Sequence, residues 1–82
     1  MHHVYATRGT CAKAIEFDLN DGIISNVQFR GGCHGNLQGI SKLVEGMKAE
    51  DVIARCGGIR CGIKSTSCPD QLTKALSEAL GK

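Results

Sequence analysis

The sequence has few aromatic residues and almost no proline. Its 82 residues include no tryptophan, one tyrosine, two phenylalanines and one proline. The core must therefore come mostly from Ile, Leu, Val and Ala. A chain of this length also buries a smaller share of its surface than a longer chain does. We expect one small domain, residues 1–82, whose marginal core would gain from a metal, a disulfide or a dimer.

A strong charge and long apolar runs are absent as well. The net charge is +2, and no aromatic residues alternate with Lys and Arg in a pattern that stacks on bases, so nucleic-acid binding is not predicted. Nothing resembles a signal peptide, and no apolar run approaches the ~20 residues that span a bilayer. We expect a cytoplasmic protein that binds no membrane.

Residues 11–19 alternate apolar and polar side chains with a period of two, which predicts a half-buried strand. One face carries Cys11, Ile15, Phe17 and Leu19, and the other carries Ala12, Ala14, Glu16 and Asp18. Lys13 interrupts the apolar face two residues after Cys11.

The sequence Asn-Asp-Gly at residues 20–22 predicts a turn. Residues 23–30 then return as a second strand, with Val27 and Phe29 on its inward face. The two strands predict a hairpin. Residues 1–7 are a candidate third strand at the edge of the sheet.

Three later segments have apolar residues at helical spacing. The first carries Leu37, Ile40, Leu43 and Val44, between a predicted N-cap at Asn36 and a stop at Gly46. The second carries Ala49, Val52, Ile53 and Cys56, and the third carries Leu72, Ala75, Leu76, Ala79 and Leu80 after Pro69 in the first turn. The sequence predicts an α+β fold, in which three helices follow an antiparallel sheet of two or three strands and pack on one face.

Five cysteines are many for a small cytosolic protein. Disulfides rarely persist in that compartment, so metal or redox chemistry is favoured over a disulfide framework. Cys56 falls on the apolar stripe of a predicted helix and is interpreted as a buried small side chain. The other four cysteines lie within two residues of a glycine or at a predicted helix start, and they are Cys11, Cys33, Cys61 and Cys68.

These four thiols are predicted to meet at one end of the fold. Cys11 and Cys33 flank the open end of the antiparallel hairpin, and Cys61 and Cys68 precede or begin a helix whose N-terminus can reach the same end. The helix dipole there favours the thiolate of Cys68. Four thiolates suit Zn²⁺ or an iron–sulfur cluster, and sulfur ligation does not distinguish the two. Because no Cys-x2-Cys pair is present, the spacing alone leaves buried, idle thiols as an alternative.

Two other functions stay open. Cys61 and Cys68 are candidates for a thiol–disulfide relay, because the segment between them is flexible. The glycine-rich stretch that follows the second strand is a candidate anion or nucleotide site. Its backbone would bind through Gly31, Gly32, Gly35 and Asn36.

Three side chains near the predicted metal site are candidate surrounding groups. The charge of Lys13 would favour nearby thiolates if it points toward them. His34 is either a ligand or proton shuttle, or an exposed loop residue. Asp70 favours the N-terminus of the last helix.

Four stretches resemble the TSCPD-domain family of small bacterial proteins. They are GTC at residues 9–11, GGCHGNLQGISKLVEGM at 31–47, GIRCG at 58–62 and TSCPDQL at 66–72. Carried over by position, the cysteines of the family fall on Cys11, Cys33, Cys61 and Cys68. Cys56 lies outside the matching motifs.

A similar segment ends the adenosylcobalamin-dependent ribonucleotide reductases. The resemblance implies a partner in deoxynucleotide synthesis, either a ribonucleotide reductase or another redox enzyme, and it is compatible with a homodimer. A chain of 82 residues cannot supply the barrel and cofactor site that a reductase needs. The resemblance therefore implies an accessory module, without catalysis of its own, that holds a metal or passes reducing equivalents.

The layout of the cysteines is also similar to that of iron–sulfur assembly scaffolds. The three scaffold cysteines would fall on Cys11, Cys33 and Cys68. Ala12 and Lys13 stand where the scaffolds carry an acidic residue. This difference favours a more permanent four-thiolate site over transient cluster assembly.

Overall fold

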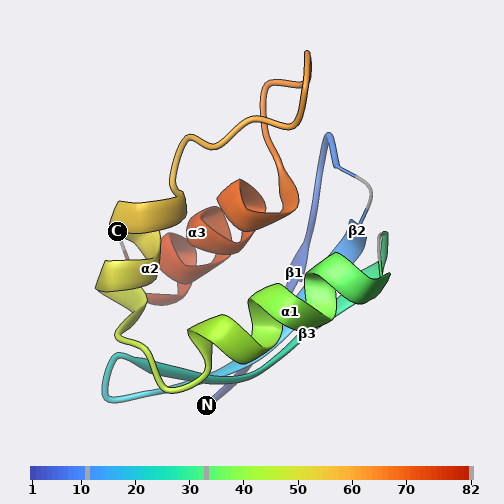
Figure 1. The fold of residues 1–82 in the computed structure, drawn as a ribbon. Coiled ribbons are helices and arrows are strands. Elements are labelled where there is room, and N and C mark those ends of the chain that lie inside the picture. Colours follow the sequence, from blue (N-terminus) through green and yellow to red (C-terminus); the bar gives the residue numbers. More distant parts are fainter. Residues whose placement is uncertain (11, 33, 82) are drawn as a thin grey trace.

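The computed structural model describes residues 1–10, 12–32 and 34–81. Its strands are β1 (His2–Ala6), β2 (Ala12–Asn20) and β3 (Ile23–Gly31), and its helices are α1 (His34–Val44), α2 (Ala49–Cys56) and α3 (Cys68–Ala79). The strands form one antiparallel sheet in the order β1-β2-β3, with the helices on one side of it (Figure 1). The predicted α+β fold, including the edge strand, is confirmed.

A two-residue turn joins β2 and β3. Asp21 and Gly22 have φ angles of 52° and 77°, and two successive positive φ angles are the geometry of the turn that suits the right-handed twist of a hairpin. Glycine adopts this conformation without steric cost, and aspartate tolerates it. The hairpin predicted from Asn-Asp-Gly is confirmed.

The register of β2 shifts at its first residues. Ala12 pairs with Gly31 and Ala14 pairs with Arg30, so Lys13 is an extra residue without a register partner on β3. The extra residue reverses the alternation before it. Ala12 is consequently buried, with 3% of its surface exposed, and Lys13 is exposed. The prediction that Ala12 lies on the polar face is wrong, and the side chain of Lys13 does not enter the core.

The register shifts again on β3, between Ser25 and Gln28. Asn26 has a φ of 53° there, and its backbone amide donates to the carboxylate of Glu45 at 2.9 Å. The shift turns Ile24 into the core, where none of its surface is exposed. The segment that follows α1 is therefore attached to the edge of β3.

The core lies between the sheet and the helices. α1 packs against β3, α3 packs against β2, and α2 packs against α3. The largest fully buried side chains come from both layers, and they are Phe17, Ile15, Ile24, Leu72, Leu76 and Val52. Cys56 packs against this core but is only half-buried.

The first and last helices begin differently from one another. α1 begins at His34, so the predicted N-cap Asn36 lies inside the helix. Gly31 and Gly32, with φ of 80° and 79°, reverse the chain directly after β3, and the helix therefore starts sooner than its apolar pattern indicates. α3 has Ser67 as its N-cap and Pro69 in its first turn. Among the helices described, none is long and apolar enough to cross a bilayer.

Charged side chains on the outer face of the sheet, opposite the helices, link β1 to β2. The ring of His2 bonds to Asp18 through Nδ1 at 3.0 Å and to Glu16 through Nε2 at 3.2 Å. Glu16 also pairs with Arg30 of β3. One histidine thus bridges two carboxylates at the start of the chain.

We predict that His2 titrates above its ordinary pKa of 6.5, because hydrogen bonds to Asp18 and then to Glu16 raise that pKa. A raised folded-state pKa stabilises the protein below 6.5, and this contribution disappears as the pH rises through the raised value. The ring signals of His2, followed by NMR against pH, should give the midpoint. Asp18→Asn should lower it. A midpoint at or below the ordinary value in the unmodified protein would contradict the bridge.

Candidate functional site

The segment TSCPDQ, residues 66–71, builds a buried network around one carboxylate. Asp70 is 5% exposed. Its Oδ1 accepts from the backbone amide of Gly58 at 2.7 Å, and its Oδ2 accepts from the hydroxyl of Thr66 at 2.5 Å. The hydrogen bond from Thr66, and to a smaller extent that from Gly58, lowers the pKa of the Asp70 carboxyl below its ordinary value of 3.8. Because Gly58 and Thr66 are the two ends of the loop 58–66, Asp70 closes the loop that carries Cys61.

Two neighbours of Asp70 extend the network. The hydroxyl of Ser67 donates to the carbonyl of Ile59 at 2.7 Å and accepts from the amide of Asp70 at 3.1 Å. The Nε2 of Gln71 donates to Thr66 at 3.0 Å, and its Oε1 accepts from the backbone amide of Arg8 at 3.1 Å. Arg8 belongs to the turn between β1 and β2. The segment therefore fixes two separate loops to the start of α3.

From the sequence, Asp70 is predicted to favour the helix N-terminus and to be a candidate group near the metal site, whereas its closing of the loop and the roles of Thr66, Ser67 and Gln71 are not predicted. All four side chains are buried, although polar residues of these types are mostly exposed in proteins. The grouping of these four polar residues around Cys68 and Pro69 is the sequence feature that could have indicated their structural role. Burial could not be inferred without the position of the loop.

Cys68 opens α3 and contacts the turn before β2. Its Sγ lies 2.6 Å from the Oγ1 of Thr10, and the residue is half-buried and forms no disulfide within the described residues. Thr10 is the residue immediately before Cys11 in the sequence. The contact joins parts of the chain that are far apart in sequence.

Cys61 lies in the loop that Asp70 closes. It is exposed and forms no disulfide in the part of the chain that the structure describes. Its backbone amide donates to the carbonyl of Thr66 at 3.1 Å, and its carbonyl accepts from the amide of Lys64 at 3.0 Å. The backbone at Cys61 is therefore held by hydrogen bonds while its sulfur faces outward.

Cys11, Cys33 and the side chain of His34 lie outside what the structure describes. The residues next to the two cysteines do lie together. Ala12 pairs with Gly31, and a Cβ built on Gly32 would lie 3.0 Å from the backbone nitrogen of Ala12. Within residues 1–10, 12–32 and 34–81, no group of three or more His, Cys, Asp or Glu side chains is arranged to hold a metal ion.

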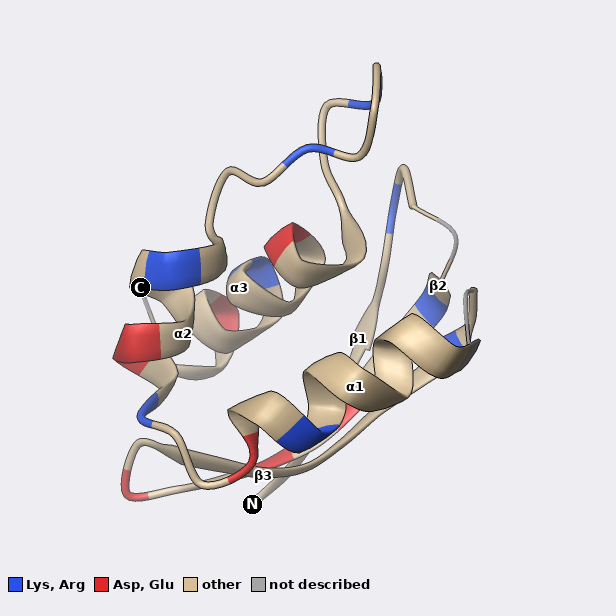
Figure 2. Cartoon of the chain, in the orientation of Figure 1, with Lys and Arg blue, Asp and Glu red and all other residues tan. Residues whose placement is uncertain are grey.

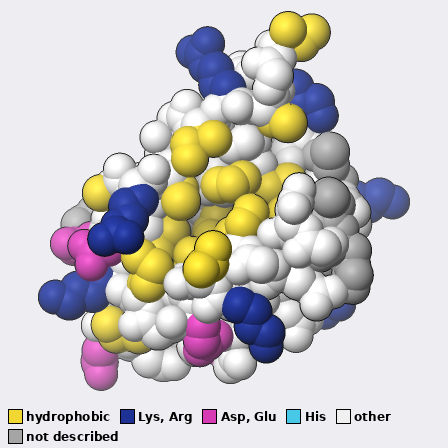
Figure 3. All heavy atoms as spheres, viewed as in Figure 1, with side chains coloured by type: hydrophobic (Ala, Val, Ile, Leu, Met, Phe, Trp, Pro, Cys, Tyr) yellow, Lys and Arg dark blue, Asp and Glu magenta, His cyan; other side chains and the backbone are white. Residues whose placement is uncertain are grey.

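A groove with a volume of about 570 Å³ separates α1 from the loop 58–66 and the start of α3. Cys61 of the loop and Cys68 at the start of α3 line this groove together with Thr10. The remaining walls are largely apolar and include Leu37, Ile40, Leu43, Ile59 and Pro69. Figure 3 shows the hollow and the hydrophobic side chains around it on this face of the molecule.

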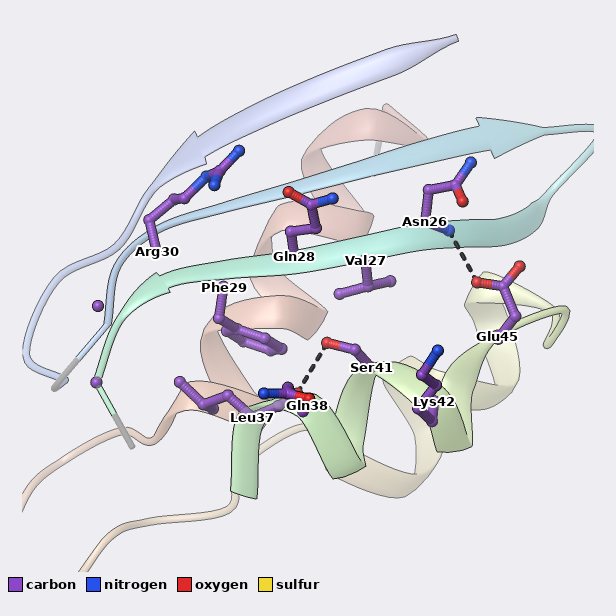
Figure 4. A pocket seen from close by; sticks show the side chains of 12 residues that line it. Asn26, Val27, Gln28, Phe29, Arg30, Leu37, Gln38, Ser41, Lys42 and Glu45 are labelled. Carbon is purple, nitrogen blue, oxygen red and sulfur yellow. Dashed lines mark hydrogen bonds between the residues drawn. The ribbon is translucent and has the colours of Figure 1, made fainter. Parts of the chain in front are cut away.

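A second pocket, of about 510 Å³, lies between β3 and α1 (Figure 4). Its lining includes Gly31 and Gly32 with the charged side chains of Arg30, Lys42 and Glu45. The other two residues of the candidate anion site, Gly35 and Asn36, line the first groove instead. The structure therefore divides the predicted anion-binding residues between two cavities.

A family model for the TSCPD domain matches residues 1–80. The sheet with three helices on one face and the loops fixed by TSCPDQ are the structure of this domain, and the chain belongs to the TSCPD domain family. Neither a curated protein nor a solved structure matches the chain.

We predict that Asp70→Ala destabilises the fold by about 2–3 kcal/mol, because buried donors from Gly58 and Thr66 lose a charged partner. Asp70→Asn keeps the size and one acceptor and should cost less. Urea unfolding at neutral pH measures both. The depressed pKa also means that the stabilisation by Asp70 is present above pH 3.8 and is lost as the pH falls through the lowered value. If Asp70→Ala unfolds at the wild-type urea concentration, the carboxylate does not close the loop.

Proposed function

We propose that this domain holds one Zn²⁺ ion or one iron–sulfur cluster through Cys11, Cys33, Cys61 and Cys68. The contact between Thr10 and Cys68, at 2.6 Å, is the observation that carries the proposal. It brings the residue before Cys11 against the sulfur of Cys68. Thiolates are the donors that both kinds of metal group accept.

The chain segments that flank the four cysteines support the same assignment. Ala12, which follows Cys11 in the sequence, packs beside Gly31 and Gly32, which precede Cys33. Cys61 and Cys68 line one groove with Thr10. Cys61 and Cys68 therefore lie at this end of the molecule. The residues that flank Cys11 and Cys33 in the sequence lie there as well.

The charge at this end also suits an anionic metal site. Figure 2 shows basic residues on the loop before α3 and near the turn between β1 and β2. Arg8, Lys13, Arg60 and Lys64 are all exposed there, whereas the nearby acid Asp70 is buried in its own hydrogen bonds. Cations near a cysteine favour its charged form, and four thiolates around Zn²⁺ carry a net charge of −2 that the basic residues would offset.

The bound group would supply either folding free energy, as Zn²⁺ does in small domains, or electron transfer, as a cluster does. The residues of the chain position the ligands. Asp70 and Gln71 fix the two loops, and the hydroxyl of Thr10 bonds to the sulfur of Cys68. By family resemblance, we propose a role as a cytoplasmic accessory of a ribonucleotide reductase or another redox enzyme in deoxynucleotide synthesis.

We predict that protein purified without air contains one bound Zn²⁺ or one cluster per chain. Metal analysis and an absorbance spectrum identify which, because iron–sulfur clusters absorb visible light and Zn²⁺ does not. Serine in place of Cys11, Cys33, Cys61 or Cys68 should remove most of the metal. Cys56→Ser is the matched control and should keep it. Fresh protein without stoichiometric metal would end the proposal.

Thiol–disulfide exchange is a second candidate, favoured by the shared groove of Cys61 and Cys68 and by the exposure of Cys61. In such a relay, a disulfide of a partner protein accepts two electrons and two protons from the pair and becomes a dithiol. The two sulfurs of this domain then form one disulfide. Exchange needs an accessible sulfur, and Cys61 is exposed.

We predict for this candidate that a Cys61–Cys68 disulfide forms reversibly in glutathione buffers near the cytosolic potential. Rapid alkylation followed by mass spectrometry would count the oxidised fraction at each potential. Cys56→Ser should leave the titration unchanged, whereas Cys61→Ser should abolish it. A pair that stays fully reduced across this range is not a relay.

A further inference from the structure

Large exposed hydrophobic side chains gather beside the thiol-bearing groove. In the described part of the chain, the strongly exposed ones include Leu43 at 79%, Ile59 at 44% and Ile63 at 105%. Leu43 and Ile59 line the groove, and Ile63 lies in the loop between the lining residues Cys61 and Lys64. Single exposed hydrophobic residues are ordinary, but a group around a hollow marks an interaction site.

The shape of the groove suits a helix. α1 forms one wall with Leu37, Ile40 and Leu43, which recur every three residues and so form a ridge along one side of that helix. Ile59 and Pro69 stand on the opposite wall. An amphipathic helix can place its apolar side chains between two such walls, because its backbone hydrogen bonds are already satisfied.

The charge around the groove selects the partner. Arg60 and Lys64 line it, and among the described residues no acidic side chain does. Figure 2 shows acidic residues on α2, on α3, near the β2–β3 turn and at the end of α1. The acid in the first turn of α3, Asp70, is buried in its own hydrogen bonds. In a two-fold dimer formed through this groove, a second copy of the chain would bring its own Arg60 and Lys64 against these two cations, and such like-charge contacts are unfavourable. The complementary surface is therefore acidic.

We propose that this groove binds an acidic amphipathic helix of a partner protein, with apolar side chains between α1 and the loop 58–66 and carboxylates at Arg60 and Lys64. The assignment rests on the exposed side chains and charges that line the groove. It does not require a metal or a disulfide at Cys61 and Cys68. Binding would cover both thiols, since both line the groove.

The test uses the full chain and a displayed library of random peptides of about 16 residues, long enough for a bound helix. Selected peptides should combine apolar residues at helical spacing with Asp and Glu. A synthetic copy of one selected peptide should shift the backbone NMR signals of α1 and of residues 59–69. Its counterpart with Lys in place of every acid should bind at least tenfold more weakly, and added salt should weaken the acidic peptide.

Variants locate the binding surface. Leu43→Ser and the double change Arg60→Glu with Lys64→Glu should each weaken the acidic peptide roughly tenfold. Val4→Ser and Arg55→Glu are matched controls. Val4 is 66% exposed on the edge strand β1, Arg55 is an exposed cation on α2, and neither lines the groove. Circular dichroism should show that all four variants keep the wild-type helix content.

Several results would overturn the proposal. One is that the library yields no acidic helical peptide, and another is that Val4→Ser weakens binding as much as Leu43→Ser does. A dimer in sedimentation that Leu43→Ser dissociates would assign the groove to a second copy of the chain. Binding to anionic lipid vesicles that Ile63→Ser abolishes would assign it to a membrane surface. Metal content is measured on the same samples, so a failure here is distinguishable from a failure of the proposed metal site.

Discussion

The buried carboxylate of Asp70 is the interaction on which the thiol-bearing end of this domain depends. It accepts hydrogen bonds from both ends of the loop 58–66 and stands in the first turn of α3. A buried carboxylate is costly unless such bonds satisfy it, and here each oxygen has a partner. The same side chain therefore shapes the loop of Cys61 and the N-terminus that carries Cys68. Gln71 extends the constraint to the turn before β2.

Within this short motif, the polar side chains and the cysteine have different roles. The polar residues of TSCPDQ, residues 66–71, hold the backbone, and the cysteine between them is left with its sulfur at a groove. Loop geometry at the site is consequently set by hydrogen bonds within the chain before any ligand arrives. The cysteine side chains proposed to hold the metal would lose little conformational entropy when it binds, which is the usual advantage of a preorganised site.

The sequence predicted the fold well because its periodicities are regular. The hairpin, the edge strand and the three helices follow from alternation, helical spacing and one Asn-Asp-Gly turn. The two register shifts could not be predicted, because an extra residue such as Lys13 or Asn26 leaves no mark on composition and only reverses which neighbours face inward. The start of α1 was placed late because Asn36 is a good N-cap by type, whereas the glycine pair before it decides where the chain turns. Cys68 was placed correctly at a helix start, and its contact with Thr10 required the tertiary fold.

The attachment of the α1–α2 connection to β3 has a consequence for assembly. The amide of Ile24 donates to the carbonyl of Met47, and the amide of Gly46 donates to the carbonyl of Ile24, while Asn26 donates to Glu45. In this half of the strand, the backbone amide and carbonyl of Ile24 and the amide of Asn26 are therefore already paired and not open to a neighbouring molecule. Lateral growth of the sheet, the route by which small β-rich domains polymerise, would have to begin at β1 or at the far half of β3. A domain this small thereby keeps a sheet of only a few strands without exposing its whole border to aggregation.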